Sequence, residues 1–475
     1  MKIAQLTSTN PATNEKLWSG TVADATSINR AVEASIDAQK RWEDTPLETR
    51  KQIIRSFSEQ VVAYGEEAAR IIAEDSGKPL WEARTEVKSL RNKVQAVFDA
   101  YEQRACTVTK QVSGRLSVTR YRPHGVMAVL GPHNFPMSMP NSHVMPALLA
   151  GNSVIFKPSE KTPYAGEYYA DLWLRAGLPK DTLQVLHGTS DVAHVLIAHP
   201  RVNGVLFIGS RQAGISIQKQ LVGASDKICA LEMGGNSPLV IWDYDDLRLA
   251  VHITVQSGYI SGGQRCSSAR RLIIRRTIAD EFVPALRQAV ERIIVGGQFD
   301  TNPTPFMGPL IDRDAVRNFF SKYDAAISAG AGVIVPAQPI PELGDNFVKP
   351  GLIDVTDIKL PDEEVFGPLL QISHVSTLAE AIAEANATQF GLAAGIVTQD
   401  RASYEQFYRQ TKAGIINWNQ PLTGATTAAP FGGVKASGNY RPAGYLSVDY
   451  CSYPCASIED ETPTVPEKMV AGVSY

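Results

Sequence analysis

The first hundred residues carry a helical pattern of apolar positions. Apolar side chains recur every three or four residues through "SINRAVEASIDAQKRW", "ETRKQIIRSFSEQVVAYGEEAARIIAEDSG" and "WEARTEVKSLRNKVQAVFDAYEQ", which is the period of an amphipathic helix. We therefore predict three amphipathic helices between Ala23 and about Ala105.

Beyond residue 125 the pattern changes to short apolar runs separated by segments of helix length. The runs are "GVMAVLGP", "NSVIFKPS", "TLQVLHG", "NGVLFIGS" and "KICALEMGG", and a second series contains "RRLIIRR", "GVIVPA", "GLAAGIVTQ" and "AGIINWN" with helices near 278–294, 313–329 and 377–387. Such alternation predicts parallel sheets built from βαβ units. The fold class is therefore α/β, with two Rossmann-type domains that meet near residues 233–270.

Length and composition restrict the function classes. A chain of 475 residues exceeds the roughly 250–300 residues that one core supports, so two or three domains are expected. A net charge of −3 with 20% charged residues does not indicate a nucleic-acid partner. No run approaches the ~18 apolar residues of a membrane helix, so no membrane insertion is expected.

Cysteine and histidine positions bear on the compartment and on metals. The five cysteines are scattered, whereas secreted disulfide scaffolds are dense in cysteine, so a cytoplasmic protein is expected. The eight histidines form no HxxxH or HxH pair and no CxxC occurs. We expect no bound metal.

Several polar residues follow predicted strands. Asn134, Lys157 with Glu160, Gly209 with Ser210, and Glu232 each stand at or just beyond a strand end, where α/β sheets bind their ligands. The turn "GSRQAG", Gly209 to Gly214, opens a helix and favours an anion such as a pyrophosphate; the alternative is an ordinary strand-to-helix turn. In "KPSE", the lysine and the glutamate could hydrogen-bond the two ribose hydroxyls of an adenosine. The alternative interpretation is a helix N-cap at Ser159 beside a solvated ion pair.

Cys266 lies in the glycine-rich stretch "SGGQRCSSARR". Most free cysteines are small buried hydrophobes. Positive charge from Arg265, Arg270 and Arg271 is expected to lower its pKa, and glycines at 262 and 263 would let a substrate approach. The context favours a nucleophile. Cys451 and Cys455, among aromatics, are interpreted as structural.

Taken in order, Asn134, "KPSE", "FIGS", "LEMGG", "GQRC" and "EEVFGP" resemble the aldehyde dehydrogenase superfamily over nearly the whole chain. The resemblance implies that Cys266 is the nucleophile, Glu232 the general base, and Asn134 with the Cys266 N–H the oxyanion hole. It implies that NAD is held by the residues Lys157, Glu160, Gly209, Ser210, Gly214, Glu364 and Phe366. One departure is His133, where many relatives carry tryptophan, which bears on the local packing.

The chemistry that the resemblance implies needs these residue types. A thiolate adds to the aldehyde carbon, two N–H donors hold the alkoxide at roughly 3 to 4 kcal/mol per donor, and a thioester remains after hydride has left. A buried Glu232 with a raised pKa then activates water. Glu160 accepts from a ribose 2′-hydroxyl and repels a 2′-phosphate, so NAD is expected over NADP.

The expected substrate is a small aldehyde. Segments such as "NSHVMPALLAGNSVIFKPSEKTP" and "FGGVKASGNYRPAGYLSVDYCSYPCAS" resemble the branch that oxidises a dicarboxylic semialdehyde from glutamate in arginine catabolism. Arg265 is a candidate carboxylate anchor, whereas we expect Arg441 to pair between subunits. Methionines at 137, 139 and 145 make the presumed channel apolar, so a medium- or long-chain aliphatic aldehyde is the alternative.

Other function classes stay open at this stage. A cofactor-free cysteine esterase or hydrolase leaves "KPSE" and "GSRQAG" unexplained, and a non-catalytic relative is expected to lack nucleophile or base. A CoA-acylating enzyme typically lacks the base at Glu232.

The resemblance also implies a domain plan. It gives an NAD-binding domain at 1–103 and 125–234, a catalytic domain at 235–445, and an arm with C-terminal extension at 104–124 and 446–475. The arm is a β-hairpin, "CTVTKQVSGRLSVTRYR", paired with a strand near "YLSVDYCSYPCASI". Because its strands leave an open edge, a homodimer or homotetramer is expected.

Overall fold

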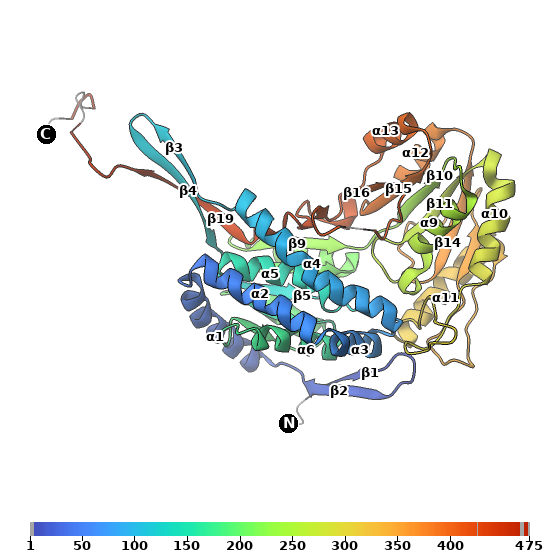
Figure 1. Ribbon diagram of the computed structural model, residues 1–475, viewed down its shortest axis with the longest axis horizontal. Helices are drawn as coiled ribbons and strands as arrows, with labels where there is room; N and C mark the ends of the chain where they lie inside the picture. The colour runs from blue at the N-terminus through green and yellow to red at the C-terminus, as the bar shows by residue number, and fades with distance from the viewer. Residues whose placement is uncertain (1–3, 425, 466–469, 474–475) are drawn as a thin grey trace.

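The computed structural model describes residues 4–424, 426–465 and 470–473. Two sheets with their helices lie side by side, and a thin arm of strands projects from one of them (Figure 1). A separate two-stranded hairpin, β1 (Gln5–Thr9) and β2 (Lys16–Thr21), lies at the edge of the molecule, and the described residues that follow β19 (Ser452–Glu459) continue beyond the arm.

The first sheet has five parallel strands, β7-β6-β5-β8-β9. They are β5 (Val126–Leu130), β6 (Ser153–Lys157), β7 (Leu183–Val185), β8 (Gly204–Gly209) and β9 (Ile228–Met233). Winding from β5 goes first through β6 to β7, then restarts at β8 on the other side. This order places a crevice at the carboxyl ends of β5 and β8, where α/β sheets bind ligands.

Both faces of strand β5 are buried, because its side chains alternate between two apolar cores. Val126 and Ala128 pack against α1 (Ala25–Glu43) and α7 (Ser190–Ala198), whereas Met127 and Val129 belong to the larger core on the other face. Successive side chains point to opposite sides of a strand, so a continuous apolar run is required. The larger core includes α5 (Ser138–Ala150) and α6 (Pro163–Arg175).

Four helices, not the predicted three, precede the arm. The middle prediction is divided into α2 (Leu47–Ala63) and α3 (Gly65–Ser76), and α4 (Leu80–Arg104) follows. The break is at Tyr64, whose φ of −112° and ψ of 16° are not helical. No described helix is both long and apolar enough to cross a membrane.

The second sheet has seven strands, β12-β13-β14-β11-β10-β15-β16. All neighbours are parallel except β12 and β13. The strands are β10 (Ser237–Ile241), β11 (Ala269–Arg275), β12 (Gly332–Val335), β13 (Gly351–Asp354), β14 (Leu369–Val375), β15 (Ala393–Val397) and β16 (Ile415–Trp418). Its helices are α9 (Leu247–Tyr259), α10 (Arg276–Glu291), α11 (Arg313–Ser328), α12 (Leu378–Asn386) and α13 (Arg401–Gln410).

The arm contains the predicted pairing. Strands β3 (Val108–Val112) and β4 (Arg115–Pro123) form the hairpin, and β19 (Ser452–Glu459) pairs antiparallel with β4. All five residues of β3 are exposed, so the arm presents an open edge. The N-terminal hairpin of β1 (Gln5–Thr9) and β2 (Lys16–Thr21) was not predicted. Positions 1–3, 425, 466–469 and 474–475 of the predicted domains lie outside the described residues.

Candidate active site

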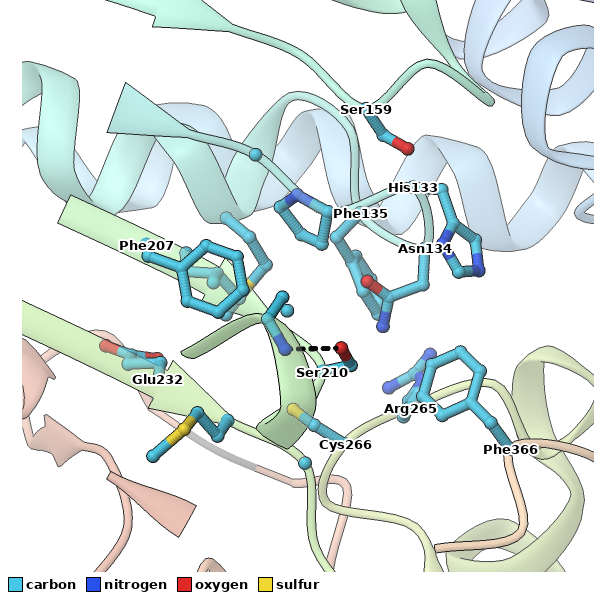
Figure 2. A pocket seen from close by; sticks show the side chains of 18 of the residues that line it. His133, Asn134, Phe135, Ser159, Phe207, Ser210, Glu232, Arg265, Cys266 and Phe366 are labelled. Atoms are coloured by element: carbon cyan, nitrogen blue, oxygen red, sulfur yellow. Dashed lines mark hydrogen bonds between the residues drawn. The ribbon is translucent and has the colours of Figure 1, made fainter. Parts of the chain in front are cut away.

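One cavity of about 1240 Å³ contains nearly all the predicted site residues. Nine of the ten line it, and they come from both sheets: Asn134, Lys157, Glu160, Gly209, Ser210, Glu232, Cys266, Glu364 and Phe366. Figure 2 shows Asn134 and Phe135 facing the segment that carries Arg265 and Cys266, with Glu232 at its strand. Strand ends far apart in sequence therefore meet at one site.

Gly214 is the exception among the ten. It lies inside α8 (Arg211–Gln220), where a Cβ would stand 2.3 Å from the Met233 sulfur. The structure gives it a packing role between helix and strand, and does not place it on the cavity wall.

The turn before Cys266 is shaped by left-handed backbone. Ser261, Gly262 and Gly263 all have φ between 58° and 69°, a region that favours glycine. A Cβ on Gly263 would lie 2.2 Å from the Gly367 carbonyl oxygen. Gly263 therefore lets the cysteine loop pack against Gly367. Neither Gly262 nor Gly263 lines the cavity, so the expectation that they open a path for substrate was wrong.

The thiol of Cys266 has a raised, not a lowered, pKa. Burial raises the pKa to about 12, and the carboxylates of Glu364 and Glu232 act in the same direction. The nearby arginines are engaged elsewhere: Arg265 with Glu82 at 2.8 Å, and Arg271 with Glu384 at 2.5 Å. The expected arginine activation was therefore wrong, and the thiol needs a base or added positive charge before it can react.

Arg270 is also committed to structure. It is fully buried and donates to the carbonyls of Gly263, Arg265 and Gly367. Three backbone acceptors hold its guanidinium behind the loop, so it fixes the shape of the turn.

Asn134 has one amide hydrogen left for a ligand. Its Nδ2 donates to the Gln264 carbonyl at 2.8 Å, which fixes the side chain, and an amide carries two hydrogens. The free hydrogen and the Cys266 N–H belong to adjoining segments of the cavity wall. This arrangement can hold an oxyanion formed on Cys266.

His133, where many relatives were expected to carry tryptophan, packs against an aromatic residue of the second sheet's domain. Its ring meets that of Phe366 edge to face, with centroids 5.6 Å apart. Burial, with Lys161 and Lys78 nearby, lowers its pKa to about 3. The residue is a neutral packing group beside the cavity.

Glu232 has the setting of a general base. It is buried at the end of β9, and one oxygen accepts from the Ala443 N–H at 2.9 Å. Among the described residues its Oε2 has no hydrogen-bond partner. Burial raises the pKa to about 8, opposed by the Ala443 N–H and by Lys93. A carboxylate whose pKa lies near neutral pH can take a proton from water.

Polar residues at and after the end of strand β6 of the first sheet form part of the cavity wall. Lys157 is buried and its Nζ donates to the Pro158 carbonyl at 2.9 Å and to Glu160 at 3.5 Å. Glu160 keeps 43% of its side chain exposed, so its carboxylate can accept from a ligand. Ser159 does not cap α6, because Thr162 is the residue that precedes the helix.

The turn after β8 begins α8. Ser210 is its N-cap and accepts from the Ala213 N–H at 3.3 Å. The remaining first-turn N–H groups and the helix dipole favour an anion. This end of the cavity fits a phosphate group.

Glu364 lies against Gly234 and Gly235, in the segment that connects the two sheets. It accepts from the Gly235 N–H at 3.1 Å, and a Cβ on Gly234 would stand 2.0 Å from its carboxylate. Burial raises its pKa. With Glu160, Lys157 and the α8 turn on the opposite wall, the donors and acceptors fit the ribose hydroxyls and phosphates of a dinucleotide.

Two of the three methionines that were predicted to line the substrate channel do not reach the cavity. Met137 and Met145 are fully buried in the core, and of the three only Met139 lines the cavity. Met139 belongs to a set of cavity-lining residues on α4 and α5, which we call the α4–α5 wall. The set consists of Thr85, Glu86, Ser89, Lys93, Val97, Ser138, Met139 and Ser142. The wall is largely polar.

Sequence reasoning missed this wall, although one pattern along α4 points to it. Glu82, Glu86 and Lys93 share the buried face of α4 with apolar residues such as Leu90 and Val97. Charged residues within an apolar stripe are uncommon, and that pattern identifies them as candidates. The described residues contain no group of three or more His, Cys, Asp or Glu side chains placed to hold a metal.

Comparison with known proteins agrees with this geometry. The family model described as "Aldehyde dehydrogenase family" matches residues 2–454. The chain is 45% identical over 461 residues to the N-succinylglutamate 5-semialdehyde dehydrogenase of Sphingopyxis alaskensis, covering 96% of this chain and 94% of that protein. It is 44% identical to N-succinylglutamate 5-semialdehyde dehydrogenase 1 of Caulobacter vibrioides, covering 98% of each.

Solved structures are similar over nearly the whole chain. One is an indole-3-acetaldehyde dehydrogenase of P. syringae in complex with NAD⁺, with a TM-score of 0.91, 29% identity, and 96% and 93% of the chains covered. Another is an NADP-dependent glyceraldehyde-3-phosphate dehydrogenase of Bacillus halodurans complexed with NADP, with a TM-score of 0.89, 25% identity, and 97% and 96% covered.

Proposed function

Because the chain belongs to the aldehyde dehydrogenase family and is an aldehyde-oxidising oxidoreductase, we propose that it converts N-succinyl-L-glutamate 5-semialdehyde to N-succinyl-L-glutamate with NAD. This reaction belongs to arginine catabolism by the succinyl route. The observation that carries the substrate is the full-length similarity, at 42–45% identity, to relatives that bear this one name.

In the proposed mechanism the Cys266 thiol gives its proton to water in the cavity, and the thiolate sulfur then adds to the aldehyde carbon. The resulting alkoxide accepts from the Asn134 amide and the Cys266 N–H, which stabilise negative charge as it forms. When bound, the oxidised nicotinamide supplies the acceptor for the hydride that leaves this carbon. The acyl group stays on Cys266 as a thioester.

Glu232 acts in the second half of the proposed reaction. Its unpaired Oε2 takes a proton from water as the oxygen adds to the thioester carbon. The C–S bond then breaks, the Cys266 thiolate leaves, and the carboxylic acid product loses its proton. A base on the cavity wall favours hydrolysis over transfer to CoA, and nucleophile and base together argue against a non-catalytic relative.

The substrate is tested by NADH production from a panel of aldehydes. We expect N-succinylglutamate semialdehyde to exceed C6 to C14 aliphatic aldehydes by at least tenfold in kcat/KM, about 1.4 kcal/mol. The polar α4–α5 wall and the burial of Met137 and Met145 support this direction. A preference for the aliphatic aldehydes, or turnover of esters without any NADH, would contradict the proposal.

Cofactor choice is proposed to depend on Glu160. Its partly exposed carboxylate accepts from a 2′-hydroxyl and repels a 2′-phosphate. We expect Glu160→Gln to raise kcat/KM for NADP relative to NAD by about tenfold, a change of about 1.4 kcal/mol. The exposed Glu59→Gln on α2 is the matched control. Wild-type enzyme that uses NADP as well as NAD would refute the assignment.

We further propose the division into cofactor-binding residues 1–103 and 125–234, catalytic residues 235–445, and an arm of 104–124 and 446–475 that joins two subunits. The separate sheets support the first division, because β9 ends at Met233 and β10 begins at Ser237. The open edge of β3 supports a homodimer or homotetramer.

A further inference from the structure

Lys93 is a buried cation on the α4–α5 wall. The residue is 8% exposed and lines the cavity. Its ammonium donates to the Ser138 carbonyl, and to the Ser142 hydroxyl at 2.7 Å. An ammonium has three hydrogens, so one remains for a group inside the cavity.

Two other cations near the α4–α5 wall already have carboxylate partners. Lys78 pairs with Glu86 at 2.7 Å, and Arg265 pairs with Glu82 at 2.8 Å. For Lys93 the described part of the chain contains no carboxylate within 4.0 Å. The predicted anchor, Arg265, is therefore neutralised, whereas Lys93 carries an unpaired charge. Burial lowers the Lys93 pKa to about 8, against the influence of Glu86 and Glu232.

The surroundings of Lys93 suit a carboxylate. Thr85, Ser89 and Lys93 are spaced by four residues and line the same cavity, so they form one polar stripe along α4. Lys93 also acts electrostatically on Glu232, which places it near the reacting end of the cavity. A bound anion would complete the charge balance that the protein leaves open.

We propose that the Lys93 ammonium binds one carboxylate of the substrate and thereby selects acidic semialdehydes over uncharged aldehydes. This inference rests on the proposed function and gives it a specificity residue. Ser142 orients the ammonium from beside it, and Arg265 takes no part in binding the carboxylate.

The test compares Lys93→Met and Lys93→Gln with the wild type. Lys93→Gln keeps donors for Ser138 and Ser142, so it preserves the wall if the apolar variant does not fold. Lys88→Met is the matched control, because Lys88 lies on the same helix but is exposed and outside the cavity. Each protein is assayed for kcat and KM with N-succinylglutamate semialdehyde and with hexanal.

We expect both Lys93 variants to lose about 10²-fold in kcat/KM with the acidic substrate, mostly through KM, as for truncation of one partner of a buried charge pair. With hexanal, which reports any effect of Lys93 on Glu232, the loss should be at least tenfold smaller than with the acidic substrate, and Lys88→Met should match the wild type with both aldehydes. Equal losses for both aldehydes would overturn the proposal and assign Lys93 to the support of Glu232, and no loss for either would overturn it as well.

The same data separate this inference from the proposed function. A wild-type preference for hexanal contradicts the proposed function. A wild-type preference for the acidic substrate that both Lys93 variants retain contradicts only the role of Lys93.

Discussion

Replacement of Cys266 by alanine is expected to lower kcat for NADH production by at least about 10⁴-fold, because no covalent intermediate can form without a nucleophile. The side chain lies on the cavity wall together with Asn134 and Glu232. The smaller alanine leaves the backbone N–H in place, so cofactor binding should persist. The measurement is NADH formation over the first turnover and at steady state.

Cys106→Ala is the matched control for this experiment. Cys106 is an exposed free cysteine at the base of the arm and does not line the cavity. It should retain wild-type activity. Aldehyde oxidation that survives in Cys266→Ala, with NADH released at the wild-type rate, is incompatible with the mechanism.

The α/β architecture could be predicted because its strands are long apolar runs. Strands β5, β6 and β8 are buried on both faces, and such strands need uninterrupted apolar residues. Strands β13 and β14 were missed, because "GLID" is short and "LLQISHV" carries polar residues among apolar ones. Strand β10 was also missed, although its five residues are all buried. The break at Tyr64 was missed because the helical period continues through it.

Site residues that directly follow strands could be predicted from the sequence. Ion pairs between residues far apart in the sequence could not. Strand ends converge by topology, so Glu232 and Lys157 could be grouped from sequence. The pairing of Arg265 with Glu82, 183 residues apart, could not. Burial of Cys266, which depends on how the two sheets meet, raised the thiol pKa that the arginines were expected to lower. The Arg265–Glu82 pair is also the reason why we propose Lys93, and not Arg265, as the carboxylate anchor.

Glu232→Gln is expected to separate the two halves of the reaction. Acylation should still proceed and release a burst of one NADH per active site, whereas steady-state turnover should fall by about 10²–10⁴-fold, as for loss of a general base. Glutamine can still accept from the Ala443 N–H, so the cavity should keep its shape. Rapid-mixing measurements of NADH absorbance distinguish the burst from the steady state.

The raised pKa of Glu232 predicts the direction in which steady-state turnover changes with pH. Because the Glu232 pKa is raised to about 8, only about one carboxyl in ten is ionised at pH 7, and the ionised form is the base. Steady-state kcat should therefore rise with pH up to about 8 and level off above it, and Glu232→Gln should lack this rise. The exposed Glu291→Gln on α10 should behave as the wild type. A variant that loses the burst together with turnover would place Glu232 in acylation instead of hydrolysis.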